Sequence, residues 1–473
     1  MGNNNQKKKS ESYRILSGQK IKDTKNNIFV DDSSKTIAFY LPQFHRIPEN
    51  SEWWGEGFTE WNNAVKGKSN FSDHYQPHLP RELGFYNLEN IAIMEEQVEM
   101  AKLYGLKGFC FYYYWFSGRK ILEGPINRFL KSNINFDFCL CWANENWTRR
   151  WDGEDQKVLL KQEYAKEDPV NFINSLLPFF KDKRYIRLND KPIIIVYRAK
   201  DIPDVINVFE IWRRTAKKNG FTDIHIIAVD FYDISHPGEV NADALVEFPP
   251  HKFNGISNSV DQVPQLINKD WKGSLVDFRK VIKQSLNKKA PNFKLYRGIM
   301  PSWDNTARRQ DSSTIIYKSN PDLFEIWTRY IRSYTYCNFT EEERFIFINS
   351  WNEWGEGCHL EPDQKYGLQY LEAFLKSASS SISFNLVDEM KIYNLDLIKR
   401  NMLITNMKRG INKSQRIIDI NLKSNALTFR INIKYMKERC AKRLFKVQFL
   451  YKLFKGVYLI IKIPTKYIFK FFK

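Results

Sequence analysis

The sequence has few of the features that mark secreted or membrane-spanning proteins. Its six cysteines include no CxxC pair, and those at 110, 139 and 141 lie in apolar runs, which favours small buried thiols and a reducing, intracellular setting. No uncharged apolar run approaches the roughly 18 residues that cross a bilayer. The first residues lack the apolar core of a signal peptide, and Gln6 replaces the Ser or Thr of a myristoylation motif. We expect a protein that is neither secreted by a standard signal nor integral to a membrane.

The sequence also lacks a recognisable metal or phosphate motif. The histidines at 45, 74, 78, 251 and 359 match no standard zinc spacing, so we predict no metal and no cofactor. No glycine-rich phosphate turn follows the first apolar run, which argues against a doubly wound open sheet.

Basic residues outnumber acidic ones by 19, but the surplus lies at the end of the chain. Residues 391–473 hold 21 Lys and Arg against three acidic residues, a surplus of 18, so the rest is nearly neutral. This asymmetry predicts a separate basic extension on a body that does not bind nucleic acid.

Short apolar runs alternate with helical patterns along most of the chain. We predict strands at residues 36–43, 108–115, 136–143, 192–198, 224–229, 244–248, 295–300 and 344–350. Helices are predicted at residues 88–104, 125–132, 169–180, 205–218, 275–286, 322–334 and 368–377. Eight strands, most followed by a helix, indicate an α/β fold, a (β/α)8 TIM barrel with long βα loops. We place the barrel domain at 35–382, after a polar lead-in at 1–34 and before a basic helical extension at 383–473.

Polar and aromatic residues follow each predicted strand. They are Gln43 and His45, Tyr114 and Trp115, residues 144–147, Tyr197 and Arg198, Asp230, Glu247 and His251, Trp303 and Asp304, and the segment around Glu353. The carboxyl ends of barrel strands converge on one face, where active sites of such barrels lie. We therefore predict one shared cleft at that face.

The stretch 346–363 is the strongest candidate for a functional site. An apolar run ends there in carboxylates, an amide and indole rings, which packing explains poorly. Glu353 and Glu356 are three residues apart and can face one pocket, where their repulsion separates them into an acid and a base. Glycosidic-bond chemistry uses such a pair, and indole rings suit the apolar faces of sugars. The alternative is a capped turn with solvated acids.

Five stretches together resemble the WbsX-type proteins, whose domain is related to glycoside hydrolase family 99. They read TIAFYLPQFH, WWGEGFTEWNN, HYQPHLP, WANENWTRRWDG and INSWNEWGEGCHLEPD. The resemblance covers about residues 36–380. It implies the (β/α)8 fold of the endo-acting α-mannosidases and mannanases of family 99, whose catalytic pair lies in an NEWxEG motif. That motif is residues 352–357 here, so the resemblance assigns catalysis to Glu353 and Glu356.

The resemblance also implies roles and a process. Glu353 would act as base on the sugar's own 2-hydroxyl to give a 1,2-anhydro sugar, and Glu356 as general acid and then base. Gly355 stands where the hydrolases usually carry His, and the Trp-rich insertion after the first strand is typical of the WbsX branch, which is common in O-antigen and capsule biosynthesis. We predict a carbohydrate-active enzyme of surface polysaccharide or lipopolysaccharide biosynthesis, with glycosyl transfer as its reaction. An endo-acting glycoside hydrolase and a non-catalytic glycan-binding protein are the alternatives.

Further residues are predicted to contact the glycan. They are Trp54, Glu60, Trp61, Tyr114, Asn144, Glu145, Trp147, Trp303, Asp304, Asn352, Trp354 and Glu361. Arg149 and Arg150 either hold an anionic group of the substrate or are solvated. No Asp-x-Asp nucleotide-sugar motif follows a strand, which leaves a lipid-linked or oligosaccharide donor open.

The residues after 382 mix apolar and basic side chains at helical intervals. Lys462, Lys466, Lys470 and Lys473 follow at steps of four, four and three. Such a stretch can lie on an anionic membrane surface, where each cation contributes about 1 kcal/mol. The alternative is an extension packed on the barrel, since Pro464 interrupts any single helix. We expect a cytoplasmic enzyme, peripheral on the inner face of the plasma membrane, that acts on a glycan or lipid-linked oligosaccharide.

Overall fold

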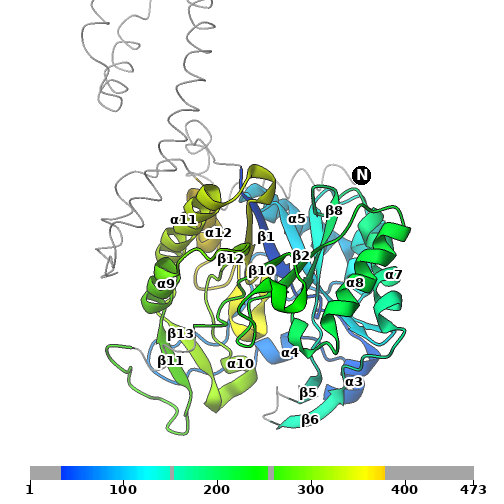
Figure 1. Ribbon diagram of the computed structural model, residues 1–473. Helices are drawn as coiled ribbons and strands as arrows, with labels where there is room; N and C mark the ends of the chain where they lie inside the picture. The colour runs from blue at the N-terminus through cyan, green and yellow to red at the C-terminus, as the bar shows by residue number, and fades with distance from the viewer. Residues whose placement is uncertain (1–32, 150–153, 254–259, 379–473) are drawn as a thin grey trace, which may run out of the picture. The chain divides into compact units, whose positions relative to one another are not determined.

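Eight parallel strands close into a barrel within residues 33–149, 154–253 and 260–378, the residues that the computed structural model describes (Figure 1). The strands are β1 (Lys35–Tyr40), β2 (Gly108–Phe116), β4 (Asp137–Trp142), β8 (Lys191–Val196), β9 (His225–Val229), β10 (Ala244–Val246), β12 (Leu295–Ile299) and β14 (Phe345–Ile348). Each pairs in parallel with the next in this order, and β14 pairs with β1. The predicted (β/α)8 barrel is confirmed.

The barrel strands are largely apolar because both of their faces are covered. All nine residues of β2 are buried, as are all those of β9, β12 and β14. Parallel strands that face a packed interior and an outer layer of helices show this continuous apolar pattern. Inside, the ring of Phe39 lies 4.8 Å from that of Phe248 and 5.8 Å from that of Phe347, measured between centroids. The barrel is therefore a filled core, and a ligand must bind at one of its ends.

Helices surround the barrel (Figure 1). They are α5 (Ile91–Leu103), α6 (Gly124–Lys131), α7 (Asp168–Lys181), α8 (Val205–Lys218), α9 (Phe278–Asn287), α11 (Pro321–Asn338) and α12 (Gln369–Lys376). The helix predicted at 275–286 is wrong at its start, because residues 275–277 belong to strand β11 (Ser274–Asp277) and α9 begins at Phe278. Leu275 and Val276 pair with β13 (Thr314–Tyr317), and Leu275 packs with Phe71. Asp277 caps the helix by accepting from Arg279 N. Burial against a distant segment outweighs the local helical pattern.

The loops after the strands gather at the lower end of the barrel in Figure 1. They contain helices α3 (Pro48–Trp54), α4 (Trp61–Ala64) and α10 (Thr306–Arg309), strand β3 (Arg119–Ile121), the pair β5 (Trp147–Arg149) and β6 (Glu154–Leu160), the pair β11 and β13, and the pair β15 (Asn352–Glu353) and β16 (Cys358–His359). Strand β7 (Arg187–Leu188) pairs with β8, and short 3-10 turns are η2 (Ala199–Asp201), η3 (Pro237–Val240), η5 (Gln310–Ser312), η6 (Glu341–Glu343) and η7 (Trp354–Glu356). This end carries the candidate site.

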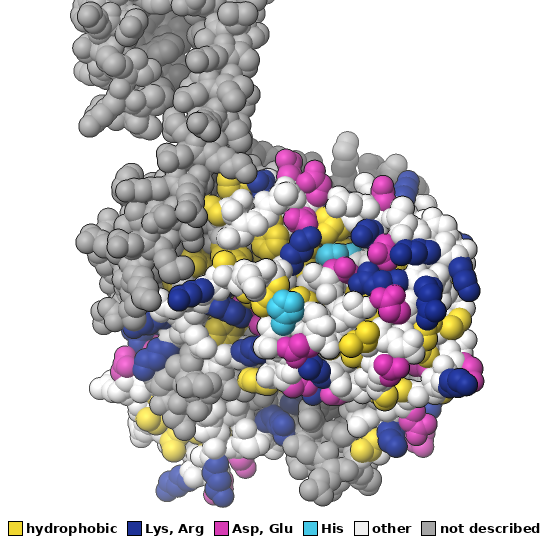
Figure 2. Space-filling model, viewed as in Figure 1, with side chains coloured by type: hydrophobic (Ala, Val, Ile, Leu, Met, Phe, Trp, Pro, Cys, Tyr) yellow, Lys and Arg dark blue, Asp and Glu magenta, His cyan; other side chains and the backbone are white. Residues whose placement is uncertain are grey.

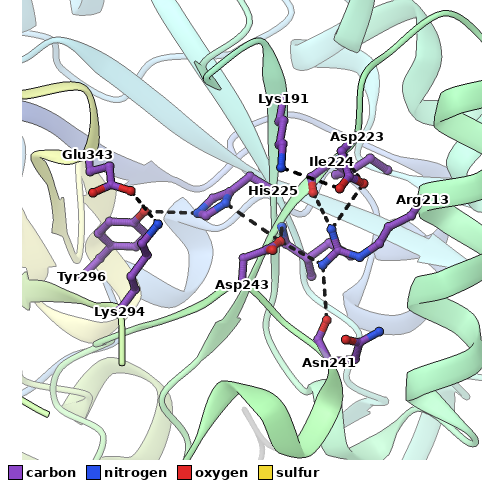
Figure 3. Close-up of polar contacts among 11 residues, drawn as sticks. Lys191, Arg213, Asp223, Ile224, His225, Asn241, Asp243, Lys294, Tyr296 and Glu343 are labelled. Atoms are coloured by element: carbon purple, nitrogen blue, oxygen red, sulfur yellow. Dashed lines mark hydrogen bonds and ion pairs between the residues drawn. The ribbon is translucent and has the colours of Figure 1, made fainter. Parts of the chain in front are cut away.

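A polar network lies where several of the barrel strands begin (Figure 3). Arg213 of α8 donates to the carbonyl of Ile224 at 2.8 Å and to Asp243 Oδ2 at 2.9 Å. His225, the first residue of β9, lies 3.1 Å from the hydroxyl of Tyr296 through its Nε2. These contacts tie α8 to the starts of β9, β10 and β12, so the side chains at this end of the barrel stabilise the fold.

We expect His225 to make the fold sensitive to acid. Burial lowers the pKa of His225 from 6.5 to about 4. The folded protein therefore keeps this imidazole neutral at pH values where the unfolded chain protonates it, so its contribution is complete above pH 6.5 and is lost as the pH falls towards 4. The loss is on the order of 3 kcal/mol. Urea unfolding at pH 7, 5.5 and 4 should show a shallower pH dependence for His225→Gln than for the wild type, and equal slopes would contradict this.

Charged side chains of both signs are interspersed over the face of the molecule in Figure 2, in keeping with the near-neutral charge of this part of the chain. Among the described residues, no helix has the length and the apolar run that crossing a membrane requires. Cys110, Cys139 and Cys141 are fully buried thiols in β2 and β4, as predicted. The predicted extension at 383–473 and all but the last two residues of the predicted lead-in lie outside the described residues.

Candidate active site

A cavity of about 520 Å³ opens at the end of the barrel where the strands end. Its walls are largely aromatic: Trp54, Tyr112, Tyr114, Trp147, Tyr197, Phe231, Tyr232, Phe248 and Trp303. Polar groups reach it from Gln43, Glu145, Asn146, His251, Asn305, Arg308, Arg309, Glu353 and Glu356. This size and this mixture of aromatic walls with a few converging polar groups are typical of small-molecule sites.

The two glutamates of the cavity come from the tight turn that follows β14. Ser350 fixes the turn, because its Oγ accepts from Glu353 N at 2.9 Å and donates to the carbonyl of Cys358 at 2.7 Å. Gly357 ends the turn in the left-handed region at φ 55°, where a Cβ would lie 3.0 Å from the carbonyl of Asp304. A residue with a side chain would be strained at that point. The segment after β12 holds the turn from outside, since Asp304 N donates to the carbonyl of Glu356 at 2.7 Å.

Arg308 joins both glutamates to a third carboxylate. From α10, its Nη2 lies 2.8 Å from Glu353 Oε1 and its Nη1 lies 3.0 Å from Glu356 Oε1. Its Nε and Nη2 also donate to Glu60 Oε1, at 3.0 and 2.6 Å. Glu60 is fully buried. A planar guanidinium can bind carboxylates on several edges at once, so Arg308 fixes the distance between the two cavity glutamates.

The Glu60–Arg308 pair explains the glycine between the two glutamates. A Cβ at Gly355 would lie 2.3 Å from Glu60 Oε1 and 2.8 Å from Arg308 Nε. A larger residue has no room there while this ion pair is in place. The Glu60–Arg308 ion pair therefore requires a glycine at position 355.

Burial raises the pKa of both cavity glutamates. Burial raises the pKa of Glu353 well above its usual range, and the charges of Glu356 and Glu60 add to the effect while Arg308 opposes it. Burial also raises the pKa of Glu356, again opposed by Arg308. The Glu353 side chain is 7% exposed and that of Glu356 is 25% exposed. One guanidinium faces three carboxylates, so the glutamates titrate as a pair, and one can be an acid while the other is a base.

The cavity wall includes part of the predicted set of residues. Glu353, Glu356, Trp54, Tyr114, Glu145, Trp147 and Trp303 line it. Glu60, Trp61, Asn144, Asp304, Asn352, Trp354 and Glu361 do not line it and are buried behind it. These seven residues were expected to line the cleft, and the structure corrects that expectation. The side chain of Arg149 is not described and Arg150 lies outside the described residues.

The buried set supports the residues of the wall. Asn352 spans β1 and the turn, since its Oδ1 accepts from Leu41 N at 2.7 Å and its Nδ2 donates to Leu41 O at 3.0 Å. Trp61 packs against Trp354 with centroids 5.6 Å apart. The hydrogen-bond capacity and the stacking surface of these side chains are thus used within the protein, which explains why polar and aromatic residues follow the strands without facing the cavity.

Glu361 shows how tightly this second layer is built. Its Oε2 accepts from Trp354 Nε1 at 2.7 Å and from the Tyr86 hydroxyl at 2.9 Å, and its Oε1 accepts from Gln97 Nε2 at 2.6 Å. Burial raises the pKa of Glu361 to about 7.

Replacing Glu361 with glutamine is expected to destabilise the fold by about 1–3 kcal/mol. Both carboxylate oxygens accept hydrogen bonds, so the amide nitrogen of Glu361→Gln must face a donor whichever way the side chain turns. Urea unfolding of this variant, with Glu99→Gln on the exposed side of α5 as the control, measures the difference. Equal midpoints for the two variants would contradict the described network.

One group of described residues offers three metal-ligand atoms. His78, His359 and Asp363 place one each within 4.8 Å of one another. The Nδ1 of His359 lies 2.9 Å from the carbonyl of Glu361, so it carries the proton, and its Nε2 lies 2.9 Å from His78 Nδ1. The two imidazoles thus satisfy each other by a hydrogen bond. This group supports the turn through the stacking of His359 on Trp354, with centroids 3.7 Å apart.

Sequence reasoning missed Arg308, and it placed Tyr197 and His251 at the shared cleft without predicting that they contact the glycan. Tyr197 was placed at the end of a strand and His251 near one, but neither was predicted to bind. They line the cavity, with the Tyr197 hydroxyl 2.7 Å from His251 Nε2. The position of Arg308, five residues after Trp303, was the available signal, but a local pattern does not show that an arginine turns inward.

Comparison with known proteins identifies relatives. The sequence model of the family described as Glycosyltransferase WbsX matches residues 36–374. "Uncharacterized protein WxcX" from Xanthomonas campestris pv. campestris, in strains ATCC 33913 and B100, is 39% identical over 338 residues, which are 71% of this chain and 48% of the relative. The chain therefore spans about half the length of the curated relatives it matches.

Two solved structures are similar at low identity. A "Glycoside hydrolase-like protein" aligns with a TM-score of 0.46 and 16% identity, over 75% of this chain and 96% of its own. A GH99 endo-alpha-mannosidase from Bacteroides thetaiotaomicron aligns with a TM-score of 0.45 and 14% identity, over 77% and 99%. The fold assignment rests on the closed strand order of this chain itself.

Proposed function

Because this chain belongs to the WbsX glycosyltransferase family, we propose that its cavity is an active site where a glycosidic bond is made or remodelled during the assembly of a surface polysaccharide. Glycosyl transfer is the reaction we favour. The sugar-binding surfaces in this proposal are the aromatic walls of the cavity, on which the apolar faces of sugar rings can rest.

The observation that carries the proposal is the pair Glu353 and Glu356, held by one arginine in an aromatic cavity. Chemistry at a glycosidic bond needs one carboxyl to give a proton to the departing oxygen and another to take a proton from the attacking one. Burial raises the pKa of both glutamates, which favours the protonated carboxyl that a proton donor needs.

We assign the roles by resemblance to family 99. Glu353 takes a proton from the sugar's 2-hydroxyl, whose oxygen then attacks the anomeric carbon. Glu356, the more exposed of the two, gives its proton to the departing oxygen and later removes one from the incoming hydroxyl. Water and a sugar hydroxyl are chemically equivalent acceptors in the second step, so this pair also suits an endo-acting hydrolase.

Mass spectrometry of cell-surface and lipid-linked glycans tests the proposal. Strains would carry the wild type, Glu353→Gln or Glu356→Gln, with Glu341→Gln as the control because Glu341 is exposed on η6, just before β14 begins. A glycan that is shorter in both cavity variants supports transfer, and the missing sugar identifies the product. A longer, untrimmed glycan supports hydrolysis. Glycans identical to wild type in both cavity variants would overturn the enzymatic proposal in favour of a binding protein.

We further propose that the protein works in the cytoplasm at the inner face of the plasma membrane, held by the basic residues after 382. Those residues lie outside the described ones, and the support is their composition. The full chain should sediment with anionic vesicles, and a chain that ends at Ile382 should stay in the supernatant. Equal sedimentation of the two would contradict this attachment.

A further inference from the structure

A second cavity, also of about 520 Å³, lies beside the active-site cavity. The two share Phe248 and His251 as wall residues. The rest of its wall comes from the ends of β9 and β10 and from α9, through Asp230, Glu247, Lys252, Phe253, Gln284, Asn287 and Lys288. Gln284 and Asn287 are exposed, so the cavity opens to solvent along α9. A ligand can therefore reach it without passing through the active-site cavity.

The charged residues of this cavity form one alternating chain. Lys252 Nζ lies 2.6 Å from Asp230 Oδ1, and Lys288 Nζ lies 3.0 Å from Asp230 Oδ2. Lys288 Nζ also lies 2.8 Å from Glu247 Oε1, and Arg297 Nε lies 2.7 Å from Glu247 Oε2. Three cations and two carboxylates make up the chain, so its net charge is +1.

Glu247, Lys288 and Arg297 each favour the charged form of the group next to them in this chain. Burial alone would raise the pKa of Glu247, but Arg297 and Lys288 outweigh it and the pKa is lowered. Burial alone would lower the pKa of Lys288, but the carboxylates of Glu247 and Asp230 outweigh it and the pKa is raised. Arg297 is fully buried and offsets Glu247 from inside the protein, so Lys252 and Lys288 are the cations that reach the cavity wall, beside Asp230 and Glu247.

Both lysines keep a donor for a ligand. An ammonium group has three N–H bonds. Lys252 uses two, on Asp230 and on the carbonyl of Ile234 at 2.8 Å, and Lys288 uses two, on Asp230 and Glu247. Among the described residues, one N–H of each ammonium thus has no protein acceptor, and the side chains are 30% and 36% exposed.

The backbone of Lys252 has an uncommon conformation. Lys252 adopts φ 64°, in the left-handed region that residues other than glycine rarely occupy. Gln284 of α9 holds it there by donating to the Lys252 carbonyl at 3.1 Å. Such a conformation persists only where surrounding contacts enforce it, and it often marks a functional position. The Lys252 side chain lines the second cavity.

We propose that the second cavity binds the phosphate or pyrophosphate group of an activated sugar donor. The lysines supply two charged N–H donors to phosphate oxygens, and the rings of Phe248 and Phe253 offer a surface for the apolar part of the donor. The shared residue His251 contacts Tyr197 of the active-site cavity. A donor bound here would have its phosphate in one cavity and its sugar in the other.

The biological meaning of this site rests on the proposed function. In the transfer that it would serve, the sugar's 2-hydroxyl oxygen gives its proton to Glu353 and bonds to the anomeric carbon. The bond from that carbon to the phosphate oxygen breaks, its electron pair leaves with the phosphate, and Glu356 gives the departing oxygen its proton. The acceptor hydroxyl oxygen bonds to the anomeric carbon, and its proton passes to a carboxylate of the catalytic pair. A phosphate site that shares wall residues with the cavity of that pair favours transfer over hydrolysis, because a hydrolase of neutral glycans has no use for one.

Isothermal titration of the full chain with inorganic pyrophosphate tests the site without any turnover. We expect binding in the micromolar to millimolar range. Lys252→Met should weaken it at least about tenfold, since one of two charged donors is lost. Lys289→Met, which removes an equal charge from an exposed residue outside the cavity, should leave it unchanged. Absence of binding at millimolar pyrophosphate, or equal loss in the two variants, would overturn the proposal.

A measurement on the wild type alone covers the case in which Lys252→Met does not fold. An amine-acylating reagent, followed by peptide mass spectrometry, should modify Lys252 and Lys288 less when pyrophosphate is present, and Lys289 equally with and without it. Unchanged modification of the two cavity lysines would also overturn the proposal.

Two further titrations identify the source of the phosphate. Uridine diphosphate that binds more tightly than pyrophosphate indicates a nucleotide-linked donor, and farnesyl diphosphate that does so indicates a lipid-linked one. Affinities equal to that of pyrophosphate support the phosphate site alone. Because binding is read directly, it can succeed while the glycan analysis of the Glu353 and Glu356 variants fails, and the reverse.

Discussion

Replacing Glu356 with glutamine is expected to lower turnover by about 10³-fold, within the range that positioned acids and bases contribute. The amide keeps the size of the side chain but cannot give a proton to the departing oxygen. Glu353→Gln should lower turnover by a similar factor, because the reaction needs both residues and either change disables the pair. Substrate affinity should change little, since the aromatic walls remain.

Turnover is compared only between proteins whose free energies of unfolding are equal. Glu341→Gln is the matched control, an equal change of charge on exposed η6. Turnover and KM are measured for all three variants on glycans extracted from cells that lack the protein. A loss that appears only in KM would show that the two glutamates bind sugar without acting on it. A loss in Glu341→Gln as large as in the cavity variants would point to general destabilisation.

Replacing Arg308 with methionine is expected to lower turnover by about 10²-fold or more at neutral pH and to move the pH optimum upward. Arg308 contacts Glu60, Glu353 and Glu356, and its charge opposes the rise in the pKa of both cavity glutamates. Without it, the pair keeps its protons to higher pH, so the base appears only as the pH rises. The upward direction of the shift in the pH optimum is the result that tests this role of Arg308.

A pH–rate profile separates this role from a merely structural one. Arg308→Lys restores a charge but cannot contact three carboxylates at once, so its profile should lie between those of the wild type and Arg308→Met. Breaking a buried ion cluster costs about 3–5 kcal/mol, so unfolding is measured alongside. The control is Arg119→Met, which breaks the pair with Glu49, where the Arg119 side chain is 52% exposed. An optimum that stays at the wild-type pH in Arg308→Met would contradict the assigned role.

The barrel strands could be predicted from the sequence because the pattern that marks each strand is local. Each strand of such a barrel is buried on both faces, so it appears as a short apolar run that ends where polar residues begin. The run at 345–348 followed by Asn352 and Glu353 is an example. The helix predicted from residue 275 failed where a distant contact decides. Leu275 pairs with Ile315, forty residues away, and this pairing overrides the local pattern.

The site could be predicted only in part for a related reason. Sequence shows the type of a side chain but not its direction, and after these strands both directions are used. Trp303 faces the cavity, whereas the next residue, Asp304, turns inward to His74 at 2.6 Å. Arg308 was missed because nothing in residues 305–309 distinguishes a buried arginine from a solvated one. Its place follows from Glu60, which is nearly 250 residues away in the chain.

The most direct test of the catalytic pair is to supply the purified protein with the glycan that accumulates when the pair is disabled. Lipid-linked glycans from cells carrying Glu356→Gln would be incubated with wild-type protein and with the variant, together with a cell extract that lacks the protein and supplies the remaining substrates. Mass spectrometry should show that the wild type converts the accumulated glycan to the next species, while the variant leaves it unchanged. Equal conversion by both proteins, or by neither, would contradict the assignment of Glu353 and Glu356 as the catalytic pair.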